Sequence, residues 1–236
     1  MSRSVLRGAA IQAEIRKAQA QVAGAAATPP ARKGVGPNAR PAAGAAVRSA
    51  SGPQGAGEIR IIGGQWKRTR LPVAQRPGLR PTPDRVRETL FNWLGQDLTG
   101  WRCVDAFAGT GALGLEAASR GAAQVLLVES DAGLVTQLDN LRQRLKADAV
   151  RVQRGDGIAA LHQCAPRSQH LVLLDPPYGA PELFAPALQA AQRAVAEGGF
   201  IYLEAPAAWS LDEGSGLRLH RHLKAGAVHA HLLQLA

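Results

Sequence analysis

"VDAFAGTGALGLE", residues Val104–Glu116, joins an apolar run to a run with helical periodicity. It contains the spacing Gly109-x-Gly111-x-x-Gly114. Glycines at this spacing let the backbone of a strand-to-helix turn approach a bound nucleotide-like ligand closely. The stretch therefore predicts the first strand, loop and helix of a Rossmann-like α/β domain. By itself it leaves the ligand open between a dinucleotide and S-adenosylmethionine.

The rest of the chain continues this alternation of strands and helices. We expect strands over 102–109, 124–130, 149–156, 170–177 and 200–206, and helices over 112–121, 132–147, 157–165 and 182–199. Residues 217–236 show no long helix and read as two extended runs about Ala225-Gly226. Strands that alternate with helices form a parallel sheet covered on both faces. The predicted fold class is α/β, with a mostly parallel seven-stranded sheet that ends in a C-terminal antiparallel hairpin.

A smaller unit is expected in front of this domain, over residues 58–80. Alternation in Glu58–Ile62, a Gly63-Gly64 turn and a second extended run predict an N-terminal β-hairpin. Cations beside an aromatic ring suit phosphate contact and base stacking. The alternative is a solvated edge hairpin with its tryptophan packed inward. The candidate RNA contacts are Trp66, Lys67, Arg68, Arg70 and Arg80.

The main domain, residues 81–236, is expected to open with a helix in "RPTPDRVRETLFNWLGQ". Thr82 suits the N-cap and Pro83 the first helical position, and Gly95 can end the helix. The apolar stripe of a helix on a core is formed by Val86, Leu90, Trp93 and Leu94.

The formal net charge of +10 lies mainly in the N-terminal part of the chain. Residues 1–57 hold eight basic residues and one acidic residue, and residues 58–100 hold eight and four, whereas residues 101–236 are nearly neutral. This asymmetry predicts a polyanionic partner, with a solubilising tail as the alternative. Because residues 1–57 are rich in Ala, Gly, Pro and Arg, we expect a disordered basic extension, or alternatively a targeting segment.

Several classes of protein are disfavoured by composition. No stretch approaches ~20 uninterrupted apolar residues, so no membrane span is expected. Two cysteines, Cys103 and Cys164, give no disulfide framework and favour a reducing, cytoplasmic compartment. The histidines show no helical ligand spacing, so no metal is expected. The pairs His220/His222 and His229/His231 instead suit the two arms of the terminal hairpin.

Acidic residues stand at the ends of three successive predicted strands. Asp105, four residues before Gly109, would repel a pyrophosphate but attract a ligand that carries an ammonium and a sulfonium. Glu129 lies near the ~20-residue offset at which an acid meets ribose hydroxyls, and Asp156 can border an adenine. Any one of them could instead cap the next helix. Together they predict S-adenosyl-L-methionine as the cofactor.

The fourth predicted strand runs into Asp175-Pro176-Pro177-Tyr178. Methylation of an exocyclic base amine requires acceptors for its two N–H groups, so that the nitrogen lone pair is freed to attack. An Asp175 oxygen and the Pro176 carbonyl can accept these bonds, and the fixed φ of proline holds that carbonyl in place. Tyr178 offers a face on which an extruded base can stack. The alternative is a plain β-turn.

Four segments of the chain, in this order and spacing, resemble the bacterial RsmD family of 16S rRNA (guanine(966)-N2)-methyltransferases. They are "IRIIGGQWKRTRLPV" (59–73), "GLRPTPDRVRETLFNWL" (78–94), "DAFAGTGALGLEAASRGA" (105–122) and "DPPY" (175–178). The first two segments are more specific than the shared methyltransferase motifs. The resemblance covers about residues 58–236, and residues 1–57 match nothing in the family pattern.

The resemblance implies a class I S-adenosylmethionine-dependent fold and methylation of a guanine N2 amine in 16S rRNA, on the 30S subunit or its precursor. We expect a monomer whose N-terminal hairpin engages RNA. The implied cofactor residues are Asp105, Phe107, Gly109, Gly111, Glu129 and Asp156, and the implied catalytic residues are Asp175, Pro176, Pro177 and Tyr178. The alternatives are an adenine-N6 DNA methyltransferase and a non-catalytic RNA-binding assembly factor.

Overall fold

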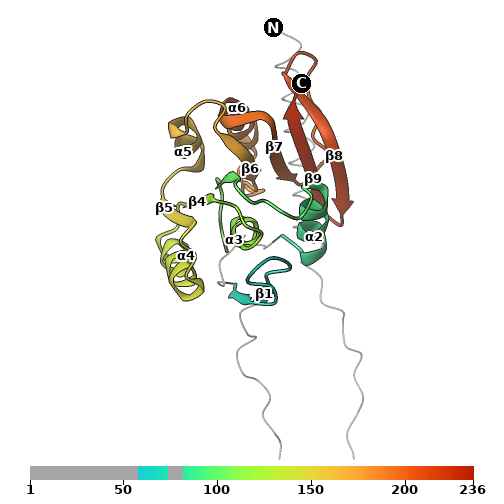
Figure 1. Cartoon of the computed structure of the whole chain (residues 1–236). Coiled ribbons are helices and arrows are strands. Elements are labelled where there is room, and N and C mark those ends of the chain that lie inside the picture. Colours follow the sequence, from blue (N-terminus) through green and yellow to red (C-terminus); the bar gives the residue numbers. More distant parts are fainter. Residues whose placement is uncertain (1–57, 74–81) are drawn as a thin grey trace, which may run out of the picture.

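The computed structural model describes residues 58–73 and 82–236 (Figure 1). The basic extension predicted over residues 1–57 and the candidate contact Arg80 lie outside these ranges. Within them, seven strands form one sheet in the order β5-β4-β3-β6-β7-β9-β8, and two strands form a separate antiparallel pair, β1-β2.

The strands and helices follow the predicted order. The strands are β1 Glu58–Arg60, β2 Arg70–Pro72, β3 Arg102–Asp105, β4 Gln124–Glu129, β5 Val150–Arg154, β6 Gln169–Leu174, β7 Val195–Ala205, β8 Leu217–Ala225 and β9 Val228–Leu235. The helices are α2 Asp84–Trp93, α3 Ala112–Ser119, α4 Ala132–Leu145, α5 Gly157–Gln163 and α6 Phe184–Ala194, preceded by the 3₁₀ turn η1 Pro181–Leu183.

The sheet has the mostly parallel topology that the sequence predicts. Strands β5, β4, β3, β6 and β7 pair in parallel, whereas β9 pairs antiparallel with both β7 and β8. The chain fills one side of β3 with β4 and β5 and then crosses to β6 on the other side. The carboxyl ends of β3 and β6 therefore flank the point where strand order reverses, which is where ligands bind in such sheets.

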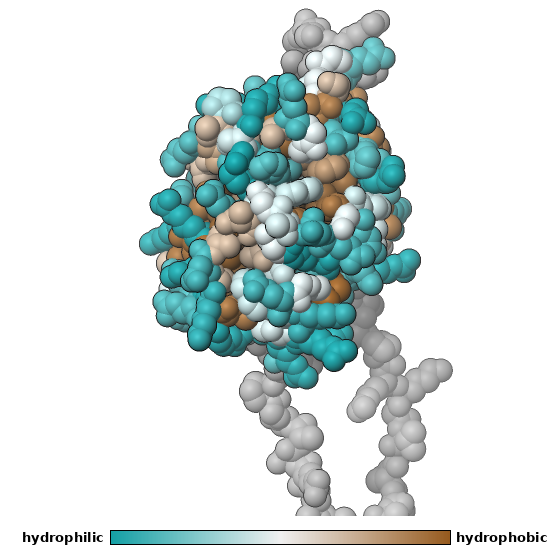
Figure 2. Space-filling model, in the orientation of Figure 1, coloured by the Kyte–Doolittle hydropathy of each residue, from teal (hydrophilic) through white to brown (hydrophobic). Residues whose placement is uncertain are grey.

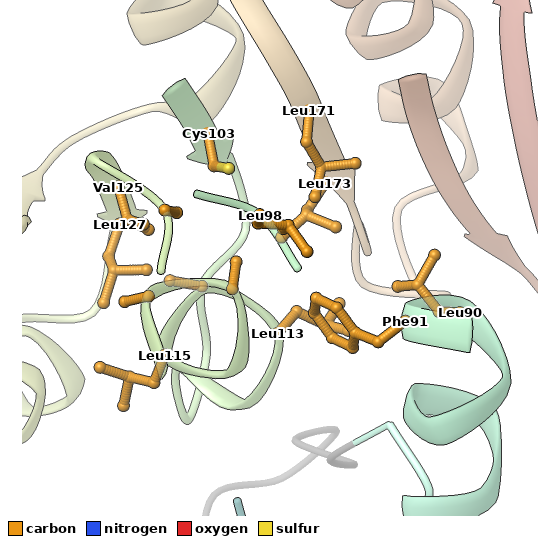
Figure 3. Packing of buried hydrophobic residues seen from close by; sticks show 14 of the residues in the cluster. Leu90, Phe91, Leu98, Cys103, Leu113, Leu115, Val125, Leu127, Leu171 and Leu173 are labelled. Atoms are coloured by element: carbon orange, nitrogen blue, oxygen red, sulfur yellow. The ribbon is translucent and has the colours of Figure 1, made fainter. Parts of the chain in front are cut away.

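Two apolar layers hold helices on opposite faces of the sheet. Side chains of α2, α3 and α4 share one buried cluster, and side chains of α5 and α6 share the other. In Figure 3, the ring of Phe91 of α2 points toward Leu113 of α3, in the same buried cluster as Leu171 and Leu173 of β6. Helix α2 thus packs on α3 and on the sheet.

The predicted Gly63-Gly64 turn is wrong, because the chain reverses in a longer loop, residues 61–69. The register of β1 and β2 pairs Glu58 with Pro72 and Arg60 with Arg70. The two glycines instead lie against α3, where a Cβ on Gly64 would stand 1.8 Å from the carbonyl oxygen of Ser119. The close approach to α3 and the positive φ of Gly64, 73°, both require glycine here.

Two predicted helix boundaries are also wrong. Pro83 occupies the N-cap position of α2, the helix begins at Asp84, and the Thr82 side chain makes no cap. Helix α6 ends at Ala194, and Val195 already pairs with Gln169 in the sheet, so that 195–199 is strand. Alanine and glutamate in this segment favour helix locally, but pairing with β6 determines the conformation.

The face of the molecule shown in Figure 2 is largely polar, with hydrophobic residues in smaller patches between the hydrophilic ones. Among the described residues, Leu219 is the one large hydrophobic side chain that is strongly exposed, at 49%. No helix in this part of the chain is long and apolar enough to cross a membrane.

Candidate active site

Five acidic residues stand at the carboxyl ends of five adjacent parallel strands. Across the sheet from β5 to β7 they are Asp156, Glu129, Asp105, Asp175 and Glu204. The first four were predicted from the sequence, and Glu204 was not. Because these strands are parallel neighbours, all five acids lie at one edge of the sheet. A row of this kind favours a cationic ligand over a pyrophosphate.

Asp105 is buried, with 1% of its surface exposed, at the end of β3. Its Oδ2 accepts a hydrogen bond of 2.9 Å from the Gly114 N–H, whereas Oδ1 has no partner within the described part of the chain. Burial raises the pKa of Asp105 to about 7, against the lowering effect of the Gly114 bond. A buried oxygen without a partner costs free energy. Such a carboxyl group fits a ligand that brings a cationic donor.

The glycines between β3 and the first turn of α3 allow a positive φ or close packing. Gly109 and Gly111 have positive φ of 53° and 78°, and Gly111 is the N-cap residue of α3. A Cβ at Gly114 would stand 2.2 Å from Leu127 and 3.1 Å from Asp105 Oδ2, so that only glycine fits beside this carboxyl group. Phe107, in the same loop, is partly buried against the α5–α6 layer.

Glu129 and Asp156 both have backbone partners in the structure. Glu129 accepts from the N–H groups of Gly109 and Asp131, each at 2.9 Å, and so ties the end of β4 to the glycine loop. Asp156 accepts from Ala159 N at 2.7 Å and caps α5. The capping role that the sequence left open is thus present at Asp156, while α4 is capped by Asp131 and not by Glu129.

Asp175 follows β6 directly and lies next to Asp105 at the switch point. Burial, the carboxyl group of Glu204 and that of Asp105 raise the pKa of Asp175 well above its usual value. Pro176 is buried and Pro177 is exposed. The stiff Pro-Pro pair thus leads the chain out of the core.

Glu204 links the Asp-Pro-Pro-Tyr segment to β7. It is 4% exposed, and its carboxyl group accepts from Tyr202 Oη at 3.0 Å and from Tyr178 Oη at 3.4 Å. Burial raises the pKa of Glu204, although the bonds from the tyrosines and Thr82 oppose this. The signal that could have found it is an acid near the end of the fifth predicted strand, "FIYLEAP", the position already used for the other acids.

Thr82 reaches the same group of carboxylates from the N-terminal side of the domain. Its side chain is buried, and its hydroxyl lies 3.5 Å from Asp175 Oδ2. The residue predicted as a helix cap therefore contacts the proposed catalytic carboxyl group. The segment "RPTPDRV" thus supplies a side chain to the site as well as a helix to the core.

The described RNA-contact candidates lie mostly in the 61–69 loop. Trp66 is half-buried and packs against the core, whereas Lys67 and Arg68 are exposed. Arg70, on β2, forms an ion pair of 3.0 Å with Glu58. The inward packing that the sequence left as an alternative for Trp66 is therefore present in part.

Buried charges fix this loop to the domain. Glu116 of α3 is fully buried and accepts from the N–H groups of Ile62 and Gly63, at 2.8 and 2.7 Å. It also pairs with Arg87 at 3.3 Å and with Arg120 at 2.8 Å. One carboxylate thus joins the loop, α2 and α3.

Two solved structures are similar to this chain in fold and in sequence. The putative methyltransferase yhhF from Escherichia coli superposes with a TM-score of 0.66 at 40% identity, covering 76% of this chain and 98% of that one. A putative methylase from Haemophilus influenzae gives a TM-score of 0.62 at 32% identity, covering 76% and 99%.

A curated relative and a family model match in sequence. Ribosomal RNA small subunit methyltransferase D of Escherichia coli K12 is 50% identical over 124 residues, which make up 52% of this chain and 62% of that relative. The match thus spans about three-fifths of the relative's length. The model of the family described as Conserved hypothetical protein 95 matches residues 59–234. The chain therefore belongs to the Conserved hypothetical protein 95 family, which is the RsmD family that its sequence motifs resemble.

Proposed function

We propose that this protein is an S-adenosylmethionine-dependent methyltransferase that methylates the N2 amine of guanine 966 in 16S rRNA, on the small ribosomal subunit or its precursor. The observation that carries the proposal is the position of Asp105 and Asp175 at the ends of the adjacent strands β3 and β6. One carboxyl group stands beside the glycine loop and the other in Asp-Pro-Pro-Tyr. The rRNA substrate is supported by the description of the Escherichia coli relative.

The cofactor would be held by the first three strands of the sheet. Asp105 Oδ1 offers a buried acceptor to a cationic group, and the Gly109–Gly111 turn allows close backbone approach. Glu129 keeps unused lone pairs for ribose hydroxyls, since each carboxylate oxygen can accept more than one bond. When bound, S-adenosylmethionine supplies an electrophilic methyl group on a sulfonium.

The residues around Asp175 would orient the attacking amine. An Asp175 oxygen and the Pro176 carbonyl accept the two N–H bonds, which positions the nitrogen lone pair for attack. Tyr178 would present its ring to the base, while Glu204 contacts Tyr178 and Thr82 contacts Asp175. After transfer the amine must lose a proton, and an ionised Asp175 is placed to accept it.

The test is methyl transfer from labelled cofactor to four acceptors: unmethylated 30S particles, unmethylated naked 16S rRNA, 30S particles already methylated at guanine 966, and duplex DNA. We expect incorporation into unmethylated particles, located at guanine N2 by nuclease digestion and mass spectrometry. The variant Asp175→Ala should lose transfer while binding cofactor with nearly unchanged affinity in calorimetry. Incorporation into DNA would favour the adenine-N6 alternative. Cofactor binding without transfer to any acceptor would favour a non-catalytic assembly factor.

A further inference from the structure

Three histidines lie close together on the C-terminal hairpin formed by β8 and β9. His222 of β8 is the direct cross-strand partner of His231 of β9, and His229 lies two residues before His231. Side chains two residues apart on a strand share a face. The ring centroids of His222 and His231 lie 4.7 Å apart, and those of His222 and His229 lie 5.3 Å apart. The register of one hairpin therefore brings three imidazoles together.

We propose that His222, His229 and His231 form a binding site for a divalent transition-metal cation such as zinc. Their ligand nitrogens all lie within 4.8 Å of one another. The Nε2 of His222 and the Nδ1 of His229 are 3.1 Å apart. Two nitrogens that bind one tetrahedral zinc at ~2.0–2.1 Å stand about 3.3 Å apart. The first two ligand atoms are thus already at the separation that a shared cation requires.

The third histidine is anchored as metal-ligating histidines usually are. His231 is 1% exposed, and its Nδ1 lies 3.2 Å from the carbonyl oxygen of Leu203, to which it can donate. This bond leaves Nε2 with a lone pair, the tautomer that a ligand needs. In the structure this lone pair accepts the Trp209 N–H at 2.9 Å. Binding therefore requires Trp209, in the irregular segment after β7, to release one hydrogen bond.

The type of ligand atom also selects the cation. Lys224, the cross-strand partner of His229, is an exposed cation on the same hairpin. Imidazole ligands select zinc, copper or nickel over magnesium or calcium, which prefer oxygen.

A neighbouring histidine provides a matched control. His220 is two residues from His222, but a β-bulge between Leu219 and Arg221 interrupts the register there. The ring of His220 packs on Phe200, at 5.6 Å between centroids, and His220 is not a member of the cluster of three. Replacing His220 therefore removes an imidazole from the same strand without removing a proposed ligand.

The test uses the full chain, produced without a histidine tag and stripped with a chelator. Calorimetry with Zn²⁺ should show one site per chain, and Mg²⁺ should show none. His222→Gln and His229→Gln should each weaken zinc binding at least about tenfold, since the loss of mere orienting partners already costs about 10–100-fold. His220→Gln should bind as the unchanged chain does. Zinc should also raise the thermal midpoint of the unchanged chain and of His220→Gln only.

Two results would overturn the proposal. One is an unchanged chain that takes up no zinc, in which case the 3.1 Å contact is an N–H···N hydrogen bond between two imidazoles. The other is zinc uptake that survives both His222→Gln and His229→Gln, which would place the metal elsewhere.

Discussion

The phenolic oxygen of Tyr178 lies 3.4 Å from Oε1 of Glu204, a buried carboxyl group on the neighbouring strand β7. This contact is at the long end for a hydrogen bond, whereas Tyr202 reaches the other oxygen of the same group at 3.0 Å. Glu204 therefore remains bonded when the Tyr178 hydroxyl is absent. The ring of Tyr178, and not its hydroxyl, is the part expected to matter for the target base.

Tyr178→Phe should accordingly retain most activity. Loss of one hydrogen bond worth about 0.5–1.5 kcal/mol lowers kcat/KM by no more than about tenfold. Tyr178→Ala also removes a stacking surface worth about 1–3 kcal/mol per base, and should lose more. Steady-state kinetics on unmethylated 30S particles compares the two. Equal losses in both variants would assign the effect to the hydroxyl.

Glu204→Gln should shift the acidic limb of the pH–rate profile to lower pH. The Glu204 carboxylate raises the pKa of Asp175, because a second negative charge nearby is costly. Removing that charge lets Asp175 ionise at lower pH, so the variant should keep more of its maximal rate there. Glu197→Gln, an exposed residue of the same strand, is the control. A limb that stays in place would mean that Glu204 does not affect the ionisation of Asp175.

Cofactor affinity should depend on pH through Asp105, whose pKa burial raises to about 7. Below that pH the carboxyl group is neutral and cannot attract a cation, so affinity should fall by up to about tenfold per pH unit. Above it, affinity should level off. Calorimetry in two buffers of different ionisation enthalpy should show proton release on binding near pH 7. Asp105→Asn should bind weakly at every pH, and a wild-type affinity that does not change with pH would contradict the assignment.

The raised pKa of Asp105 also predicts that the free energy of unfolding of the ligand-free protein depends on pH. A raised pKa means that the native state holds a proton that the unfolded chain has already lost between about pH 4 and pH 7. The contribution of Asp105 to the free energy of unfolding should therefore decrease as pH rises through this window. Asp105→Asn should lack this contribution, which urea unfolding at several pH values can measure.

Glu116→Ala should destabilise the domain by about 3–5 kcal/mol. It removes the buried carboxylate that pairs with Arg120 and, besides Asp84, with Arg87, and it leaves the Ile62 and Gly63 N–H groups without their acceptor. Urea unfolding monitored by tryptophan fluorescence measures the change in the free energy of unfolding. Glu88→Ala, at an exposed position of α2, should stay within about 0.5 kcal/mol. A similar small change at Glu116 would mean that the loop is held by its apolar contacts instead.

Local patterns were sufficient to predict a mostly parallel sheet with a C-terminal antiparallel hairpin, most of the helices, and four of the five acids at the strand ends. Apolar runs, glycine spacing and a carboxylate after a strand are properties of consecutive residues. The misses depend on contacts between distant residues. Gly64 is required by Ser119, Thr82 faces Asp175 instead of capping α2, and Val195 pairs with Gln169. The meeting of His222 with His229 and His231 likewise depends on hairpin register, which composition does not reveal.

The double variant Lys67→Gln/Arg68→Gln should bind RNA more weakly, because it loses phosphate contacts. Both side chains are exposed in the 61–69 loop, and each phosphate contact releases counterions when it forms. A plot of log affinity for 16S rRNA against log salt concentration should therefore become shallower by about 1–2 units, since single-stranded and duplex contacts contribute about 0.7–0.9 each. The matched control is Arg151→Gln/Arg154→Gln, which removes two exposed cations from the edge strand β5. Equal slopes for all three proteins would mean that the loop does not contact the RNA backbone. A shallower slope for the β5 variant alone would place the RNA at the opposite end of the sheet from the C-terminal hairpin.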